Sequence, residues 1–352
     1  MPARMVTANR HAMRETVKQN IKSRIKSNLS LNNLYHSILN DLDKVEKELE
    51  LFIDSPNRLI SEIGSYIFQN SGKKIRPALL LLCSKLFGYK GNENILMSAL
   101  IETIHAASLI HDDIIDNSEV RRGRESIHSR WGPNITVLLG DFLYIKALGY
   151  SLHSQHKQVT KILTDISARM IEGELNEYCR SGNLDLAEED YLDIIDKKTA
   201  SLFAASCQIG GILGNASDEE EHSLVEYGTS LGMSFQIIDD LLDFTGNEKV
   251  LGKPVFSDLN EGRITLPLIY TMNNDGGMNR KRITEILKEE NLNKETQKEI
   301  LEIIQSNGAL DYTYKKAEEY AFKSREVISQ FPESVHREAL ILIPEFFLTR
   351  NK

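Results

Sequence analysis

The stretch ETIHAASLIHDDIID, residues 102–116, decides the fold prediction for this chain of 352 residues. Apolar residues recur through it at the spacing of a helix with one buried face. Its end carries Asp112, Asp113 and Asp116 in the order Asp-Asp-apolar-apolar-Asp. On a helix the first and last of these carboxylates share one face about one turn apart, while the two apolar residues turn toward a core.

A second cluster of the same design, Asp239-Asp240-Leu241-Leu242-Asp243, ends another stretch with helical spacing. Like charges one turn apart repel each other, so two such clusters at apolar sites predict cations that compensate them. Oxygen ligands of this kind suit Mg²⁺, which prefers one or two carboxylates, several waters and substrate phosphates. The expected magnesium ligands are the aspartates of both clusters: Asp112, Asp113, Asp116, Asp239, Asp240 and Asp243.

Most of the chain shows helical spacing and few segments alternate like strands, so we expect an all-α fold. No Pro/Gly/Ser-rich linker follows residue 29, which predicts one domain over residues 29–352. The longest apolar run, near Leu79 to Cys83, is much too short to span a bilayer. Three cysteines lie far apart without metal-ligand spacing: Cys83, Cys179 and Cys207. We therefore expect reduced thiols in a cytoplasmic protein with at most peripheral membrane contact.

Residues 1–28 form a basic extension of a chain whose net charge is −9. Some of its basic residues recur every four positions and would form a stripe on a helix: Arg10, Arg14, Lys18, Lys22 and Lys26. Three interpretations stay open, namely a solvated extension, a segment that binds a membrane surface, and a mitochondrial-type targeting peptide. The last would place the protein in an organelle instead of the cytoplasm. We expect no nucleic-acid partner.

Cationic residues flank the clusters. Arg121 and Arg122 follow the first cluster after a few residues, so guanidinium groups and an anionic metal site would lie side by side. This combination suits a diphosphate that Mg²⁺ bridges on one side and arginine binds on the other. The alternative is that the arginines only neutralise the aspartates.

Further cations occur in shorter motifs. Lys73 and Arg76 precede a helix start expected near Pro77, where a turn can present cations to a phosphate. His105 precedes Asp112 by about two turns and therefore shares its helix face. Two lysines could each place a point charge on a diphosphate: Lys198, which lies where a helical pattern is interrupted, and Lys253.

Together these motifs resemble those of the trans-polyprenyl diphosphate synthases, most closely the long-chain branch that includes octaprenyl diphosphate synthase. The resemblance covers about residues 30–352 and rests on Gly72-Lys73-x-x-Arg76-Pro77, His105-x-x-Ser108-Leu109-x-His111-Asp112-Asp113-x-x-Asp116, Arg121-Arg122-Gly123, Gly140-Asp141, Glu172-Gly173-Glu174, Lys198-Thr199-Ala200, Phe235-Gln236-x-x-Asp239-Asp240-x-x-Asp243, Gly252-Lys253-Pro254 and Asp258-Leu259-Asn260-Glu261-Gly262-Arg263. This order of motifs is very specific. One departure is Arg263, which stands where a lysine is usual.

The resemblance implies an isoprenoid synthase-type helical bundle whose two aspartate helices face each other across a deep central cavity. It implies that Mg²⁺ is held by Asp112, Asp116 and Asp239. Contacts with an allylic diphosphate are implied for Arg121, Lys198, Thr199, Gln236 and Lys253. Contacts with isopentenyl diphosphate are implied for Lys73, Arg76, His105 and Arg122. A homodimer is implied as well.

The expected activity is that of a Mg²⁺-dependent trans-prenyltransferase that condenses isopentenyl diphosphate with an allylic diphosphate primer. We expect a long all-trans product near octaprenyl, of the kind used for quinone side chains, with geranylgeranyl diphosphate as the alternative. An alternative of another class is a non-catalytic regulatory subunit of a heteromeric prenyl synthase. Such a subunit should have lost aspartates that are all present here.

The expected product length depends on the residues that precede the first cluster. A tail anchored by its diphosphate would first pass Ala107 and Ser108, and further down it would meet Ile104 and Ile101. The first two side chains are small, so the cavity should accept a product longer than farnesyl diphosphate. The alternative is that Ala107 and Ser108 are small only to let two helices approach closely.

Overall fold

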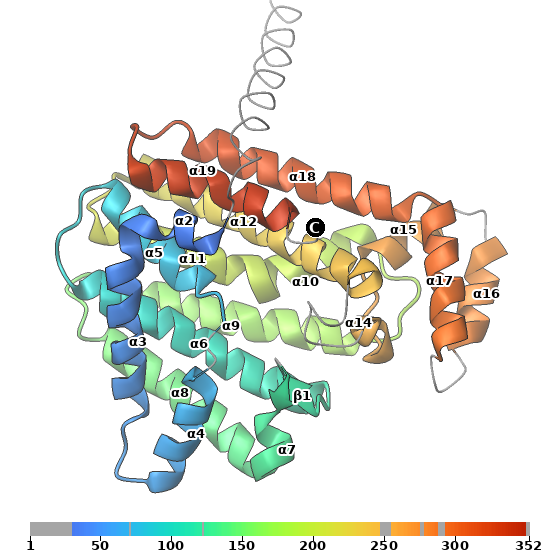
Figure 1. Cartoon of the computed structure of the whole chain (residues 1–352), viewed down its shortest axis with the longest axis horizontal. Helices are drawn as coiled ribbons and strands as arrows, with labels where there is room; N and C mark the ends of the chain where they lie inside the picture. The colour runs from blue at the N-terminus through green and yellow to red at the C-terminus, as the bar shows by residue number, and fades with distance from the viewer. Residues whose placement is uncertain are drawn as a thin grey trace, which may run out of the picture.

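The computed structural model describes residues 30–69, 72–121, 123–246, 255–274, 278–287 and 293–349, and there the fold is all-α, as predicted (Figure 1). The basic extension of residues 1–28 lies outside the described residues. In chain order the elements are α2 (Leu31–Leu34), η1 (His36–Ile38), α3 (Leu39–Ile53), α4 (Arg58–Phe68), α5 (Ile75–Leu86), α6 (Glu93–Ile115), β1 (Val120–Arg121), β2 (Arg124–Glu125), α7 (Ile127–Trp131), α8 (Pro133–Ser151), α9 (Lys157–Cys179), α10 (Glu188–Ile195), η2 (Asp196–Ala200), α11 (Ser201–Leu213), α12 (Asp218–Thr245), α14 (Ser257–Asn260), α15 (Leu266–Asn274), α16 (Met278–Leu287), α17 (Lys294–Ser306), α18 (Ala309–Ile328) and α19 (Val335–Leu348).

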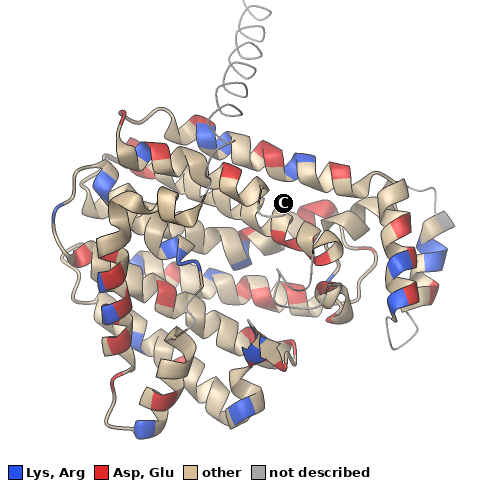
Figure 2. Cartoon of the chain, in the orientation of Figure 1, with Lys and Arg blue, Asp and Glu red and all other residues tan. Residues whose placement is uncertain are grey.

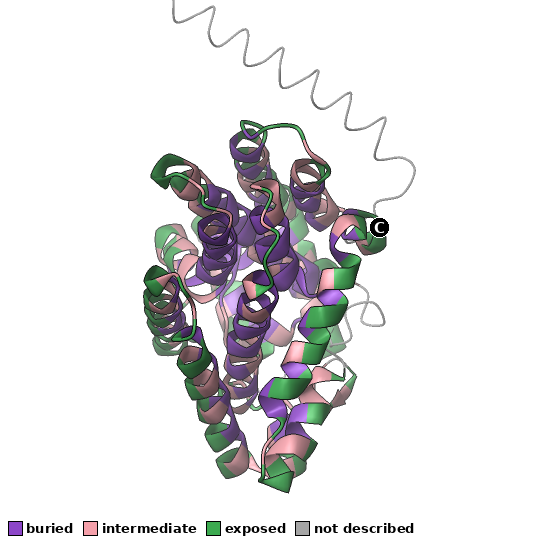
Figure 3. Cartoon of the chain, turned by 90° about the vertical axis from the view of Figure 1, so that its left-hand side faces the viewer, coloured by how far each residue is buried: buried purple, intermediate pink, exposed green. Residues whose placement is uncertain are grey.

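Helix α11 lies at the centre of the bundle. All of its residues except Gln208 are buried. A helix that is apolar on every side must be surrounded by other helices, and α11 packs against α5, α12 and α9. Figure 3 shows buried residues concentrated on the inner helices and exposed residues on the outer faces of the bundle. The buried core therefore supports η2, the turn that directly precedes α11.

Helix α12 carries the second aspartate cluster and is held close to α11. It starts with a capping box in which Ser217 and Glu220 satisfy each other's backbone N–H groups. A Cβ added at Gly228 would lie only 2.6 Å from the Cα of Ala204. Glycine at this position lets the two backbones approach, so the middle of α12 lies alongside the start of α11.

Both aspartate clusters lie at the C-terminal ends of their helices. Asp116 is the C-cap of α6, and Asp243 lies in the last turn of α12. The C-terminal end of a helix carries partial negative charge, which disfavours a carboxylate there. The fold thus adds the dipoles of two helices to the repulsion among the aspartates.

The arginine-rich stretch after α6 forms a short hairpin. Val120 pairs with Glu125 and Arg121 pairs with Arg124 in the antiparallel strands β1 and β2. Arg122 lies outside the described residues.

The surface of the described bundle mixes charges of both signs, for example along α3 (Figure 2). Among the helices that the structure describes, none combines the length and the apolar character that a membrane crossing requires.

Candidate active site

A cavity of about 1280 Å³ lies between the two aspartate helices, as predicted. Its walls come from α6, α8, α9 and α12, and loops at the ends of these helices complete it. It is large enough for two substrates of several isoprene units, since ligand pockets commonly measure about 300–1,000 Å³.

Three of the six aspartates line this cavity: Asp112, Asp116 and Asp239. The first two come from α6 and the third comes from α12, so two helices that are distant in sequence face one space. These are the three aspartates for which the family resemblance implies metal binding.

The other three aspartates do not line the cavity and contact protein side chains instead, so the structure brings three of the six expected metal ligands to this space, and metal binding by the other three stays a prediction. Asp113 forms an ion pair with Arg121. Asp240 accepts hydrogen bonds from Tyr191 and Gln236, and Asp243 accepts one of 2.7 Å from the hydroxyl of Ser257. The second residue of each cluster points away because neighbouring helix residues are turned by about 100° from each other.

The cavity concentrates negative charge around Asp112. Burial raises the pKa of Asp112 to about 7, and repulsion from Glu174 and Asp116 adds to the effect, whereas Lys198 and Arg121 oppose it. Burial also raises the pKa of Glu174. Among the described residues that line this end of the cavity, the carboxylates outnumber the cations: Asp112, Asp116, Glu174, Asp239 and Glu261 face Arg121, Lys198 and Arg263.

This donor set fits a hard divalent cation. Carboxylate oxygens from two helices converge on one space, and a cation there would relieve both the excess charge and the helix dipoles. Mg²⁺ suits such a site because it binds through one or two carboxylates and keeps its remaining positions for water and phosphate oxygens.

Lys198 is held at the cavity by two glutamates of α9. Its Nζ lies 2.6 Å from Glu174 Oε2 and also forms an ion pair with Glu177. Burial opposes its charge, but Glu177, Asp112 and Glu174 together raise the pKa of Lys198. Lys198 therefore stays cationic throughout the physiological pH range.

The backbone around Lys198 departs from the α-helical form. The interruption that the sequence indicated here is a π-helical turn, η2, between α10 and α11. Such turns insert an extra residue into a helix and often occur at functional sites. A Cβ at Gly173 would lie 2.7 Å from the backbone nitrogen of Lys198, so this glycine lets α9 approach the turn.

The roles of Glu174 and Glu177 were not predicted from the sequence. The motif Glu172-Gly173-Glu174 pointed to α9, and the three-residue spacing of Glu174 and Glu177 places both on one helix face. Their shared contact with Lys198 depends on the packing of α9 against η2, which a pattern along the chain does not reveal.

A line of hydrogen bonds orients Gln236, another predicted site residue. Thr199 donates to Gln236 Oε1 over 2.8 Å, and the amide nitrogen of Gln236 donates to Asp240 over 2.7 Å. Thr199 and Gln236 both line the cavity. The buried Asp240 therefore fixes which end of the Gln236 amide faces its neighbours.

A second set of cations lines the cavity near the start of α5. Lys73, Arg76 and His105 all belong to this wall, and α5 starts at Ile75, two residues before the predicted start. The guanidinium of Arg76 stacks on Phe203 at 4.7 Å from the ring centroid. The structure thus brings these predicted residues together. Lys253, predicted for the allylic diphosphate, lies outside the described residues.

Arg121 lines the cavity while its Nε pairs with Asp113. Its hairpin is held from outside by Tyr66, whose hydroxyl donates a hydrogen bond of 2.9 Å to the carbonyl of Glu125. The guanidinium of Arg124, the strand partner of Arg121, lies 4.1 Å from the centroid of the Tyr66 ring. These contacts hold the strand that pairs with Arg121, and the pairing with Asp113 agrees in part with the alternative that arginine neutralises the aspartates.

Of the residues expected along the path of the product tail, one lines the cavity. Ser108 lines the cavity, but the described lining does not include Ala107, Ile104 or Ile101. Ala107 is fully buried in a cluster with side chains of α8, so for this residue the structure favours the alternative that it is small to allow close helix packing. Neighbouring helix residues face different directions, which explains why Ala107 and Ser108 separate.

An aromatic residue that lines the cavity was also not predicted from the sequence. Tyr144 of α8 lines the cavity, and its ring stacks on His111 with 6.1 Å between the centroids. Burial, together with Asp112 and Glu174, raises the pKa of Tyr144. The ring therefore lies near the aspartates that would anchor a substrate.

Comparisons with known proteins agree with this arrangement. The family model of the polyprenyl synthetases matches residues 57–304. Octaprenyl diphosphate synthase from Escherichia coli (strain K12) is 36% identical over 300 residues, which cover 85% of this chain and 93% of that enzyme. Geranylgeranyl diphosphate synthase from Saccharolobus solfataricus is 32% identical over 332 residues, which cover 92% and 98%. A crystal structure of polyprenyl synthase from Caulobacter crescentus CB15, complexed with calcium and isoprenyl diphosphate, matches with a TM-score of 0.87 at 31% identity, covering 92% of this chain and 98% of that chain.

Proposed function

Because the chain belongs to the polyprenyl synthetase family and is a polyprenyl diphosphate synthase, we propose that it extends an allylic diphosphate with isopentenyl diphosphate to a long all-trans product. The observation that carries this proposal is that carboxylates from α6 and α12 and cations near the start of α5 line one cavity. We call the lining formed by Asp112, Asp116 and Asp239 the aspartate wall, and the lining formed by Lys73 and Arg76 near the start of α5 the cation wall. Two diphosphates of different roles match these two walls.

We assign the aspartate wall to the allylic diphosphate. Asp112, Asp116 and Asp239 would hold Mg²⁺, which when bound neutralises the diphosphate and makes it a better leaving group. Lys198 adds a permanent cation beside them, and Gln236 presents an oriented amide. The polyprenyl synthase from Caulobacter crescentus CB15 forms a complex with calcium and isoprenyl diphosphate, which supports the use of a divalent cation.

The cation wall is assigned to isopentenyl diphosphate. Lys73 and Arg76 bind its diphosphate, and His105, which also lines the cavity, adds a third contact. The guanidinium of Arg76 is kept in place by the ring of Phe203. No aspartate pair is needed on this side because this diphosphate does not leave.

The reaction consists of ionisation, condensation and elimination. The allylic C–O bond breaks, and its electron pair leaves with the diphosphate, whose charge Lys198 and the neighbouring donors stabilise. The double bond of isopentenyl diphosphate attacks the cation, and loss of a proton to the departed diphosphate restores a double bond. Closure of the cavity around both substrates would keep water from trapping the cation.

For product length we propose a chain near octaprenyl, of the kind used for quinone side chains, with geranylgeranyl diphosphate as the second candidate. The small side chain of Ser108 in the cavity wall supports the longer product. Relatives with both kinds of product match this chain over most of its length, so the length has to come from measurement.

We propose a homodimer that forms through α8. Leu138, Ile145 and Leu152 recur every seven residues and are 68%, 72% and 73% exposed. Apolar residues at this spacing form a stripe on one helix face, and such stripes are typical of helix–helix interfaces. A second copy would bury the stripe. Light scattering should give the mass of a dimer, and Ile145→Glu should shift it toward the monomer.

One assay tests the proposed activity. Purified protein is incubated with Mg²⁺, labelled isopentenyl diphosphate and either geranyl, farnesyl or geranylgeranyl diphosphate, and the products are separated by chromatography. We expect products longer than farnesyl diphosphate that disappear in the presence of a chelator. A protein without condensation activity would instead favour the alternative of a regulatory subunit, against which the three cavity aspartates argue.

A further inference from the structure

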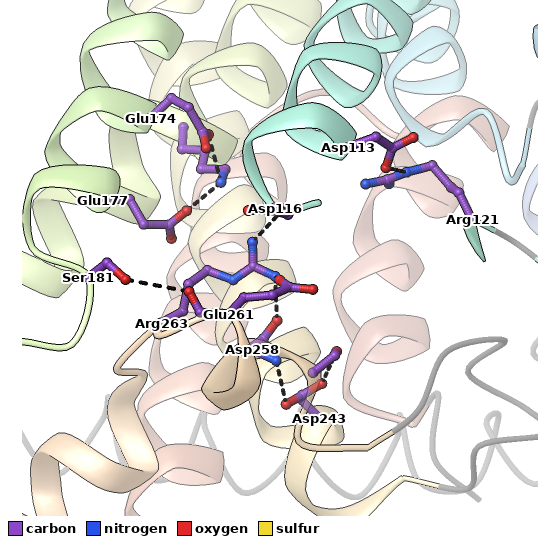
Figure 4. Close-up of polar contacts among 12 residues, drawn as sticks. Asp113, Asp116, Arg121, Glu174, Glu177, Ser181, Asp243, Asp258, Glu261 and Arg263 are labelled. Atoms are coloured by element: carbon purple, nitrogen blue, oxygen red, sulfur yellow. Dashed lines mark hydrogen bonds and ion pairs between the residues drawn. The ribbon is translucent and has the colours of Figure 1, made fainter. Parts of the chain in front are cut away.

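Arg263 connects the two aspartate clusters through a continuous set of contacts. Its Nη1 donates to Asp116 Oδ2 over 2.9 Å, and its Nη2 donates to Asp258 Oδ1 over 3.0 Å and also to Glu261. Asp116 belongs to the first cluster, whereas Asp258 and Glu261 lie in and directly after α14, downstream of the second cluster. Figure 4 shows the guanidinium between these groups.

The segment that carries Arg263 is anchored to the second cluster through Asp243. One oxygen of Asp243 accepts from the hydroxyl of Ser257 over 2.7 Å, and the other accepts from the backbone nitrogen of Asp258 over 3.2 Å. Phe256, just before, adopts a left-handed backbone with φ of 61° and packs its ring on Phe244. A phenylalanine rarely adopts this conformation unless its surroundings hold it there.

The same segment is also held by the loop that follows α9. The backbone nitrogen of Gly182 donates to the carbonyl of Gly262 over 2.8 Å, and the hydroxyl of Ser181 donates to the carbonyl of Glu261 over 3.4 Å. Arg263 thus projects from a turn that is fixed at both of its sides. Its side chain is only 18% exposed, so these contacts are partly shielded from solvent.

On these contacts we propose that Arg263 is a positioning residue that holds the Asp116 carboxylate for the metal–diphosphate complex, and that Asp243 serves this function indirectly by anchoring the segment of Arg263. The proposal rests on the proposed function. Asp116 lies at the end of α6, where a helix otherwise frays. The contact uses Oδ2 of Asp116, and its second oxygen can serve another ligand.

Arginine suits this role better than lysine. Its planar fork can donate to a group on each side at once, and here one arm reaches Asp116 while the other reaches Asp258 and Glu261. A lysine keeps the charge but offers a single point of contact. Arg263→Lys therefore separates positioning from simple charge compensation, while Arg263→Gln removes both.

The experiment compares Arg263→Lys and Arg263→Gln with a matched control, Arg282→Lys. Arg282 pairs with Glu299 between α16 and α17, and it does not line the cavity. For Arg263→Lys we expect about a 5–10-fold increase in the Mg²⁺ concentration that gives half-maximal rate, and a similar loss in the calorimetric affinity for inorganic diphosphate with Mg²⁺. The KM for isopentenyl diphosphate and the melting temperature should stay close to those of the control.

A second pair of variants tests the link to Asp243. Ser257→Ala removes one of the hydrogen bonds to Asp243 and should shift the Mg²⁺ dependence in the same direction. In the Arg263→Lys background it should add little, because residues that act through one connection show non-additive effects. Full additivity of the two changes would overturn the proposed link.

Two other results would overturn the role of Arg263 itself. One is an Arg263→Lys protein with the metal and diphosphate affinities of the Arg282→Lys control. The other is a lower melting temperature with unchanged metal dependence, which would show a merely structural residue. Absence of prenyl products from the wild type would contradict the proposed function instead, and the calorimetric comparison would still decide the role of Arg263.

Discussion

The hydroxyl of Tyr191 lies 2.6 Å from Oδ2 of Asp240 and donates a hydrogen bond to this buried carboxyl. The amide of Gln236 donates to the other oxygen over 2.7 Å. Both oxygens of Asp240 are therefore satisfied by side chains of the protein. Asp240, the second aspartate of its cluster, therefore orients Gln236, whereas its neighbour Asp239 lines the cavity.

The buried carboxyl of Asp240 should make stability depend on pH. Burial, with repulsion from Asp258, raises the pKa of Asp240 from 3.8 to about 8. The folded protein then binds a proton that the unfolded chain has lost, so this group's contribution to stability falls as pH rises from about 4 to about 8. Asp240→Asn removes this dependence, and urea unfolding between pH 5 and pH 9 should show a smaller decline in stability than the wild type shows.

Tyr191→Phe is the matched control for this prediction. It keeps the ring and removes the donor to Asp240, so we expect a loss of about 1–3 kcal/mol in the free energy of unfolding. The titrating carboxyl remains in this variant, and its decline with pH should persist. Parallel pH profiles for Asp240→Asn and the wild type would contradict the prediction.

Asp112 and Asp113 are neighbours in sequence, but only Asp112 lines the cavity. Asp112→Asn should lower kcat by at least about 100-fold because it removes a charged metal ligand. Asp113→Asn keeps a side-chain oxygen that can accept from Arg121, so it should lower kcat by less than about 10-fold. Steady-state kinetics with saturating Mg²⁺ measures both, and circular dichroism checks that the helix content is intact. Equal losses would mean that the two aspartates share one role.

The cations near the start of α5 should act on one substrate. Lys73→Ala and Arg76→Ala should each raise the KM for isopentenyl diphosphate by about 10-fold or more, because each removes a charge-assisted contact. The KM for the allylic primer should change far less. Lys198→Ala should show the opposite pattern, with the larger change in the KM for the allylic primer, because this lysine lies beside Asp112. The assignment fails if both substrates respond equally to the α5 variants.

The sequence predicted the parts of the site that depend on the spacing of residues close together in the chain. Apolar residues at helical intervals predicted α6 and α12, and the i, i+4 aspartates predicted which carboxylates share a face. Asp112 and Asp116 indeed line one cavity, whereas in the second cluster Asp239 lines it and Asp243 contacts Ser257 instead. The break at Lys198 was also visible, as an interruption of a helical pattern that the structure resolves into a π-helical turn.

Features set by packing between distant segments were beyond the sequence pattern. The direction of Asp113 depends on the hairpin that brings Arg121 to it. The pairing of Lys198 with Glu177 depends on the packing of α9, and the contact of Arg263 with Asp116 joins residues 147 positions apart. Ala107 and Ser108 are a further example. Only the position of α8 shows that Ala107 packs against a helix while Ser108 lines the cavity.

That separation of Ala107 from Ser108 leads to a prediction about product length. Ser108 lines the cavity about one turn below Asp112, so Ser108→Phe should place a ring in the path of the growing tail. We expect shorter products with the first condensation largely preserved, because the ring lies below the reacting carbon and away from the metal ligands. Ala107→Phe is the matched variant: its ring has to enter the packed contact with α8, which should lower stability by about 1–3 kcal/mol. Chromatography of the products and thermal unfolding of both variants make the comparison. Wild-type product lengths from a folded Ser108→Phe enzyme would refute this account of the cavity.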